Sequence, residues 1–241
     1  HLLKFSANLK WLFTELSVEQ RYDAAAAAGF KAAEFAWPYE HPVSFFRQLL
    51  ANSGLQQVLI NTPVGAAGSV KASGQACHPD SVAAFIADIE KAIEYASGLS
   101  CRTIHLQSGI RQPGVSDEAC YATLVENVST AAELAARENI ELVLEAINPH
   151  DNPQFILHTQ EQALSVIQDS GAGNVKLLFD FYHTQRSEGD VTAKLRRFIP
   201  HIGHVQIADS PGRNEPGSGE LNWNFIFDAL VDVGYPGWVG C

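Results

Sequence analysis

Three polar side chains end or interrupt apolar runs in the second half of the sequence. Glu145 ends "LVLE", Asp180 ends "LLFD", and Gln206 lies inside "VQI". Burying a carboxylate without a partner is so costly that the group normally pairs with a cation or shifts its pKa. If the chain brought these side chains together, their oxygens would form a hard-ligand cluster. Such a cluster suits Mg²⁺ or Mn²⁺, with positions left open for substrate oxygens.

Each of these residues also has a purely structural interpretation. An Asp at the end of a strand often caps the following helix, and a strand Gln can satisfy buried amide groups. Glu145, Asp180 and Gln206 lie at the same depth on three consecutive predicted strands, which favours one site shared by all three. His183, three residues after Asp180, would extend that site, although a histidine taken alone is more often a core or rim residue.

Four further residues are candidates to line the same site. Arg213 lies in "DSPGRNEPGSGELNW", a Gly- and Pro-rich segment that is long for a simple connection. An Arg in such a loop can hold a carboxylate through two parallel hydrogen bonds. The structural interpretation is that Arg213 forms an exposed ion pair and that the loop is a tolerated insertion. His105 in "IHLQSG" lies near the end of another apolar run, and Asn8 and Glu34 lie near the ends of the first two.

Short apolar runs alternate with amphipathic segments along the whole chain. The expected strands span residues 3–8, 31–37, 56–62, 102–109, 140–148, 175–183, 203–209 and 237–241. Helical patterns lie between them, and the first begins with Ser17 as N-cap and Gln20 completing a capping box. The pattern therefore predicts eight strands, with helical material after the first seven.

This alternation predicts the fold class. The strands are too apolar to have a solvent-exposed face, and each is followed by a helix. This pattern indicates a parallel sheet covered by helices. Eight such units fit a closed (β/α)8 TIM barrel forming a single domain over residues 1–241, and the chain contains no G-x-G-x-x-G after its first strand to support a nucleotide-binding sheet. The C-terminal ends of barrel strands meet at one mouth, which is where the polar residues above would lie.

Composition narrows the choice of partners. The formal charge of −11 opposes a nucleic-acid partner, because phosphates would be repelled over most of the surface. No apolar run approaches the roughly 20 residues that cross a bilayer, so no membrane partner is expected. The four cysteines show no CxxC spacing, which favours free thiols and a cytoplasmic location.

Several strings together resemble the hydroxypyruvate isomerase family, one of the xylose-isomerase-like TIM barrels. They are "SANLKWLFTE", "GFKAAEFAWPYE", "LVLEAIN", "FDFYHTQRSEGD", "HIGHVQIADSPGRNEPGSGELNW" and "GYPGWVGC", and they cover essentially the whole chain in the expected order. The resemblance implies a divalent-metal aldose–ketose-type isomerase with Mg²⁺ or Mn²⁺ as cofactor. Its partner would be a small hydroxy-oxo acid, and a homo-oligomer is possible.

The resemblance also implies roles for the candidate residues. Glu145 would be a catalytic carboxylate and a metal ligand, Asp180 and Gln206 would be further ligands, and His183 and Arg213 would contact substrate oxygens. We add His105 as a third substrate contact. A second catalytic Glu directly follows "GWVGC" in the family, and this chain ends at that Cys, so we expect the eighth barrel unit to be incomplete here.

The expected reaction interconverts hydroxypyruvate and tartronate semialdehyde through a cis-enediolate. A 2-oxo-tetronate isomerase would need room for only one more carbon, and a sugar 3-epimerase is disfavoured because Gln206 stands where those enzymes use histidine. An endonuclease-IV-like metallohydrolase would need a histidine-rich trinuclear zinc site. A sugar-acid-binding barrel that lacks the second carboxylate is the alternative outside enzymology.

Overall fold

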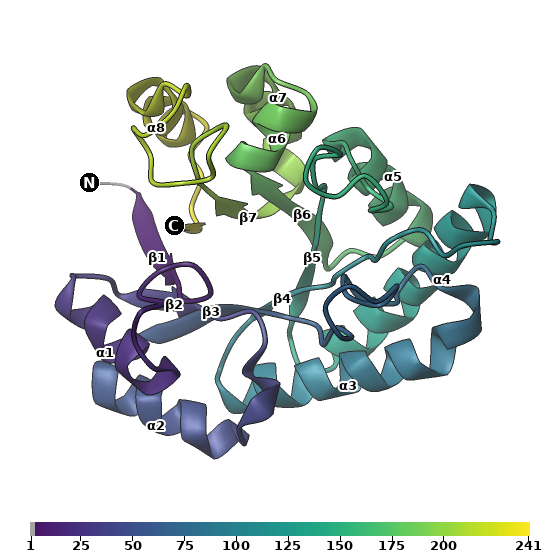
Figure 1. Ribbon diagram of the computed structural model, residues 1–241, viewed down its shortest axis with the longest axis horizontal. Helices are drawn as coiled ribbons and strands as arrows, with labels where there is room; N and C mark the ends of the chain where they lie inside the picture. The colour runs from purple at the N-terminus through teal and green to yellow at the C-terminus, as the bar shows by residue number, and fades with distance from the viewer. Residues whose placement is uncertain (1–2) are drawn as a thin grey trace.

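The computed structural model describes residues 3–241 as eight parallel strands closed into a barrel, with helices around the outside (Figure 1). The strands follow one another around the barrel in chain order, and β8 pairs with both β7 and β1 to close it. They are β1 (Lys4–Asn8), β2 (Ala32–Glu34), β3 (Gln56–Asn61), β4 (Thr103–His105), β5 (Glu141–Glu145), β6 (Val175–Asp180), β7 (Ile202–Gln206) and β8 (Trp238–Gly240). The predicted barrel is confirmed.

Helices lie between successive strands on the outer surface. They are α1 (Val18–Ala27), α2 (Val43–Ser53), α3 (Val82–Gly98), α4 (Asp117–Ala136), α5 (Gln160–Ser170), α6 (Phe181–Ser187), α7 (Val191–Phe198) and α8 (Trp223–Asp232), with short 3₁₀ helices at Pro38–Glu40, Pro79–Ser81 and Ile199–His201. The predicted capping box of α1 is present, because Ser17 accepts from the Gln20 backbone N–H and Gln20 reaches back to Ser17. These helices bury the apolar outer face of the sheet.

The predicted sixth strand, 175–183, is wrong over its last three residues. Strand β6 stops at Asp180, and helix α6 begins at Phe181. Asp180 ends the strand because its carboxylate accepts the backbone N–H of His183 at 3.0 Å and so caps the helix. His183 therefore comes from the first turn of a helix, not from a strand.

Strands β5, β6 and β7 each end in one of the predicted polar residues. Asp180 at the end of β6 pairs with Gln206 at the end of β7, and Gln206 pairs with Gly240 of β8. Glu145 ends β5 beside Leu178 of β6. Parallel strands in a barrel direct such ends toward the same mouth, so three elements deliver side chains to one place.

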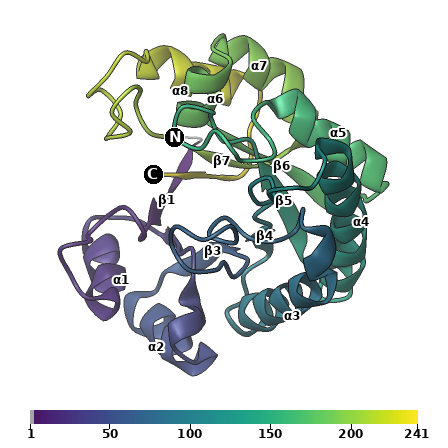
Figure 2. The ribbon, with the colours of Figure 1, turned by 45° about the vertical axis from the view of Figure 1, so that its right-hand side comes forward.

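A long loop joins β7 to α8 (Figure 2). One buried carboxylate, that of Asp209, organises this loop. Asp209 accepts hydrogen bonds from the backbone N–H groups of Gly217, Gly219 and Leu221 and from the indole N–H of Trp223, all between 2.9 and 3.1 Å. Burial would raise the pKa of Asp209, but these donors outweigh it and lower the pKa to about 2. Hydrogen bonds to the ionised Asp209 carboxylate therefore hold in place the loop that carries Arg213.

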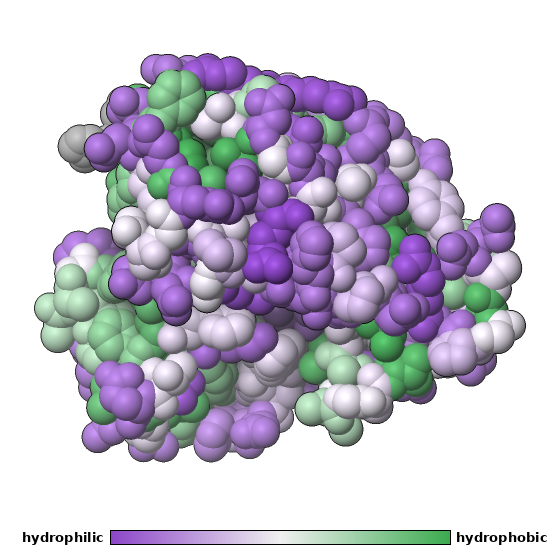
Figure 3. Space-filling view, turned by 45° about the horizontal axis from the view of Figure 1, so that its top comes forward, coloured by the Kyte–Doolittle hydropathy of each residue, from purple (hydrophilic) through white to green (hydrophobic). Residues whose placement is uncertain are grey.

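The outer surface is mostly hydrophilic on the face drawn in Figure 3, with hydrophobic side chains in small patches. The large apolar side chains that are exposed are Trp11, Val82 and Phe225. Among residues 3–241, no helix combines the length and the hydropathy that a bilayer span requires. All four cysteines are free thiols.

Candidate active site

A cavity of about 320 Å³ opens at the C-terminal ends of the strands. It is lined by most of the residues predicted from the sequence: Asn8, Glu34, His105, Glu145, His183, Gln206 and Arg213. Asp180 lines an adjoining cavity of about 290 Å³, which shares Asn8, Gln206 and Arg213 with the first. The structure therefore gathers all the predicted residues around one continuous mouth.

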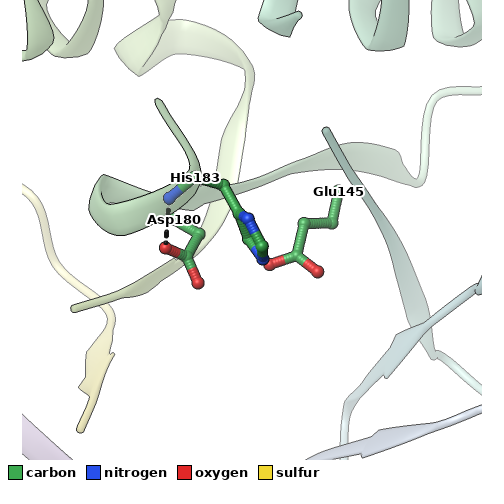
Figure 4. A group of neighbouring side chains, drawn as sticks. All are labelled: Glu145, Asp180 and His183. Carbon is green, nitrogen blue, oxygen red and sulfur yellow. Dashed lines mark hydrogen bonds between the residues drawn. The ribbon is translucent and has the colours of Figure 1, made fainter. Parts of the chain in front are cut away.

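Glu145, Asp180 and His183 form the centre of this site (Figure 4). Each offers a ligand atom, and these atoms all lie within 4.8 Å of one another. All three side chains are buried. The last residues of two neighbouring strands and the first turn of a helix thus converge on one point.

The carboxylates of Glu145 and Asp180 lie close together, and neither is paired with a Lys or Arg side chain of the described residues. Burial, and then the neighbouring Asp180, raise the pKa of Glu145 well above its usual value, while Arg213 and Lys10 act in the opposite direction. No Lys or Arg within residues 3–241 forms an ion pair with either carboxylate. Two buried carboxylate groups in this position have the donor chemistry that a divalent cation requires, so the residues present fit a metal site.

His183 is held as a neutral hydrogen-bond donor. Its Nδ1 lies 2.9 Å from Asn148 Nδ2 and 3.3 Å from the Asn148 backbone nitrogen. The side-chain oxygen of Asn148, Oδ1, accepts from the backbone N–H of Asp151, so the side-chain nitrogen of Asn148 faces the ring, and His183 Nδ1 is the acceptor. The proton of the imidazole is therefore on Nε2.

The Nε2–H of His183 faces a second donor across the cavity. Arg213 Nη2 lies 3.4 Å from His183 Nε2, and both groups carry hydrogens. Burial lowers the pKa of His183, against the opposing charge of Asp180, so the ring stays neutral. Two donors that converge on the cavity suit an acceptor oxygen of a ligand, and His183 is a better partner for that oxygen than for a metal.

Arg213 is fixed by aromatic and acidic neighbours. Its guanidinium carbon lies 4.7 Å from the centroid of Trp11 and 5.0 Å from that of Tyr182, and its Nη1 lies 3.9 Å from Asp151. Its backbone has φ of 60°, a conformation uncommon outside glycine. The loop and its contacts hold the guanidinium over the mouth.

His105 lies deeper, at the end of β4. Its Nε2 is 3.9 Å from Glu145 Oε1 and, within the described residues, has no hydrogen-bond partner. Burial, followed by the nearby His204, Lys10 and His183, lowers the pKa of His105 to about 3. His105 is a neutral ring beside Glu145.

Gln206 contacts Glu34, and both residues line the cavity. The Gln206 amide N–H donates to Glu34 Oε1 at 2.7 Å. Burial would raise the pKa of Glu34, but His204 and hydrogen bonds from Ser6 and Gln206 outweigh it and keep the pKa below its usual value. Asn8 uses its side-chain oxygen to accept the Lys10 backbone N–H at 3.1 Å, which leaves its amide nitrogen to the cavity.

Sequence reasoning missed several residues that shape the mouth. Lys10 lines the cavity with its ammonium 4.4 Å from the centroid of Trp37 and 5.1 Å from that of Trp11. The signal that could have revealed Lys10 is its position two residues after the end of the first strand. Asn148 and Asp151 lie three and six residues after Glu145, the end of β5, but nothing in their sequence pattern indicates contact with His183 or Arg213.

The profile of the xylose isomerase-like TIM barrel family matches residues 22–241. The chain belongs to this family. It is 41% identical to a hydroxypyruvate isomerase of Escherichia coli (strain K12), over 100% of this chain and 93% of that protein. It is 40% identical to a 2-oxo-tetronate isomerase of Cupriavidus necator, over 99% of this chain and 91% of that protein.

Solved structures agree with this membership. A crystal structure described as an AP endonuclease, family 2, from Brucella melitensis is 36% identical with a TM-score of 0.95, covering 99% of this chain and 92% of that one. A D-psicose 3-epimerase from Clostridium cellulolyticum H10 has a TM-score of 0.83 at 19% identity, covering 99% and 84% respectively. The second likeness bears on the barrel fold alone.

Proposed function

We propose that this protein is a metal-dependent isomerase that interconverts hydroxypyruvate and tartronate semialdehyde. The observation that carries the proposal is the pair of buried carboxylates, Glu145 and Asp180, facing the converging N–H donors of His183 and Arg213. The full-length similarity to a hydroxypyruvate isomerase supports the same chemistry. The small cavity suits a substrate of a few carbons.

The cofactor would be Mg²⁺ or Mn²⁺, held by Glu145, Asp180 and the side-chain oxygen of Gln206. When bound, such a cation supplies Lewis-acid polarisation of a carbonyl oxygen. Oxygen donors from three strands match the preference of these hard ions.

The reaction needs two proton transfers between neighbouring carbons. One proton leaves the hydroxymethyl carbon, and one is added to the former carbonyl carbon. The hydroxyl proton passes from the hydroxymethyl oxygen, which becomes the aldehyde oxygen, to the former carbonyl oxygen, which becomes the new hydroxyl. Glu145 carries one of these transfers. The resemblance assigns the second to the Glu that directly follows "GWVGC" in the family.

The remaining cavity residues bind and orient the substrate. The Nε2–H of His183 would donate to the substrate oxygen on which negative charge develops, a placement that stabilises an enediolate. Arg213 would bind the substrate carboxylate, and His105 would contact the substrate beside Glu145. Lys10 would add a second positive charge at the mouth.

A 2-oxo-tetronate isomerase is the second candidate. Relatives of that name match this chain as extensively as the hydroxypyruvate isomerases do, for example at 40% identity in Cupriavidus necator. The substrate differs by one carbon, and the same site residues would serve both reactions. Relative kcat/KM values on the two acids distinguish the candidates.

Two other classes are less well supported. The metal-ligating group found among the described residues has two carboxylates and one histidine, which opposes a histidine-rich trinuclear zinc site. A sugar-acid-binding barrel without turnover would require the isomerase-like site to be retained for binding alone.

The test is an isomerase assay on metal-stripped protein with hydroxypyruvate and 2-oxo-tetronate. Turnover restored by Mg²⁺ or Mn²⁺ is expected, and residues 1–241 should be compared with a chain that carries Glu directly after Cys241. Tight binding of hydroxypyruvate by the longer chain without any turnover would overturn the proposal in favour of a binding protein.

A further inference from the structure

Side chains of β1, β2 and β7 form a buried polar cluster, two members of which, Glu34 and Gln206, line the cavity. At its centre is Glu34, which is 2% exposed. Glu34 Oε2 accepts from Ser6 Oγ at 2.6 Å and from His204 Nε2 at 2.9 Å, and Oε1 accepts from Gln206 Nε2 at 2.7 Å. Of these four residues, Gln206 is the proposed metal ligand.

The carboxylate determines which end of the Gln206 amide faces the cavity. An ionised carboxylate only accepts hydrogen bonds, so the neighbouring amide must present its NH₂ group to Glu34. The amide oxygen and nitrogen are nearly equal in size, and packing alone would not distinguish the two orientations. With the nitrogen bound to Glu34, the oxygen of Gln206 is left for the cavity that Gln206 lines beside Asp180.

We propose that Glu34 is a positioning residue that makes Gln206 an oxygen ligand. This inference rests on the proposed metal-dependent function, because a hard cation binds the amide oxygen and not the amide nitrogen. Ser6 and His204 hold the carboxylate from its other side, and Glu34 in turn orients the Gln206 amide. Glu34 is not one of the proposed metal ligands and acts on the metal through Gln206.

The test measures Mn²⁺ binding directly, by calorimetry or electron paramagnetic resonance, without substrate. Glu34→Gln keeps the shape of the side chain but adds an NH₂ group, so Gln206 can turn its own nitrogen toward the cavity. Mn²⁺ affinity is expected to fall about 10–100-fold, as for other losses of groups that orient metal ligands. Ser6→Ala is the matched control, because it removes another donor to Glu34 and leaves the Gln206 contact; it should keep Mn²⁺ affinity within about twofold of the wild type, since the orienting bond is intact.

A reciprocal exchange separates positioning from a merely structural role. In the double variant Glu34→Gln with Gln206→Glu, the new Gln donates to the new Glu, which again presents an oxygen to the cavity. Recovery of Mn²⁺ affinity in the double variant supports the proposal, and so does recovery of both folding and binding if Glu34→Gln alone fails to fold. A folded double variant that does not regain affinity overturns it.

The outcomes distinguish this inference from the proposed function. Unchanged Mn²⁺ affinity in Glu34→Gln, with an active wild-type enzyme, overturns the role of Glu34 alone. Mn²⁺ binding that depends on Glu34 in a protein without isomerase activity supports the positioning role and overturns the proposed reaction. A wild-type protein that binds neither Mn²⁺ nor Mg²⁺ overturns both.

Discussion

The absence of a side chain at Gly240 is what leaves room for the carboxylate of Glu34. A Cβ atom added at Gly240 would lie 2.7 Å from Glu34 Cδ, inside the distance that Cβ atoms keep from their neighbours. Gly240 is also the register partner of Gln206. The eighth strand therefore shapes the site through a glycine that makes space for a group on the second strand.

Gly240→Ala should disturb the site and the barrel together. Overpacking of a buried position costs about 1–3 kcal/mol, and displacement of Glu34 would release Gln206. We expect a lower free energy of unfolding in urea and weaker Mn²⁺ binding. Gly173→Ala is the control, because a Cβ there meets nothing within 4 Å. Equal behaviour of the two variants would contradict the account of Gly240.

Glu145→Gln should abolish turnover while the fold remains intact. A positioned acid–base group contributes roughly 10²–10⁴-fold, so kcat should fall at least that far. In metal-free protein the melting temperature should not fall, because the substitution removes one of two neighbouring buried carboxylates. The exposed Glu126→Gln, on α4, should leave both quantities unchanged. Turnover near the wild-type rate would rule out the assigned role.

Arg213→Met should weaken use of a carboxylate substrate. Hydrogen bonds to charged groups contribute about 1.5–3 kcal/mol, which corresponds to roughly 10–100-fold in kcat/KM. Steady-state kinetics of this variant should be compared with those of Arg196→Met. Arg196 forms an exposed ion pair with Asp232, and neither residue lines the two cavities. A kcat/KM for Arg213→Met that matches the control would remove Arg213 from substrate binding.

Asp209→Asn should destabilise the protein in a pH-dependent way. The pKa of Asp209 is lowered from 3.8 to about 2 on folding, so its stabilising effect is complete above about pH 4 and is lost as the pH falls toward 2. At pH 7 the variant should lose about 1.5–3 kcal/mol in free energy of unfolding, since Asp209 accepts several hydrogen bonds as a charged group.

The difference between wild type and Asp209→Asn should shrink between pH 4 and pH 2, as followed by urea unfolding. Asp232→Asn is the matched control; its exposed pair with Arg196 predicts a change below about 1 kcal/mol at every pH. A constant difference across this range would show that the charge of Asp209 does not stabilise the loop.

The sequence by itself determined the barrel and the main acids of the site. Apolar runs alternating with amphipathic segments indicate buried parallel strands covered by helices. Burial of a carboxylate costs free energy, so a carboxylate at the end of such a run indicates a functional site. Glu145 and Asp180 were found in this way. His183 was found beside Asp180, although its strand assignment was wrong because local patterning cannot tell a strand end from a helix capped by that same Asp.

Only the tertiary structure decided which partners those residues have. Glu34 and His204 are separated by 170 residues, and their contact depends on closure of the barrel and on the register of its strands. The donor state of His183 depends on Asn148, and the free oxygen of Gln206 depends on Glu34. Hydrogen-bond direction is a property of atoms brought together across the fold, so periodicity along the chain, which reports only burial, cannot reveal it.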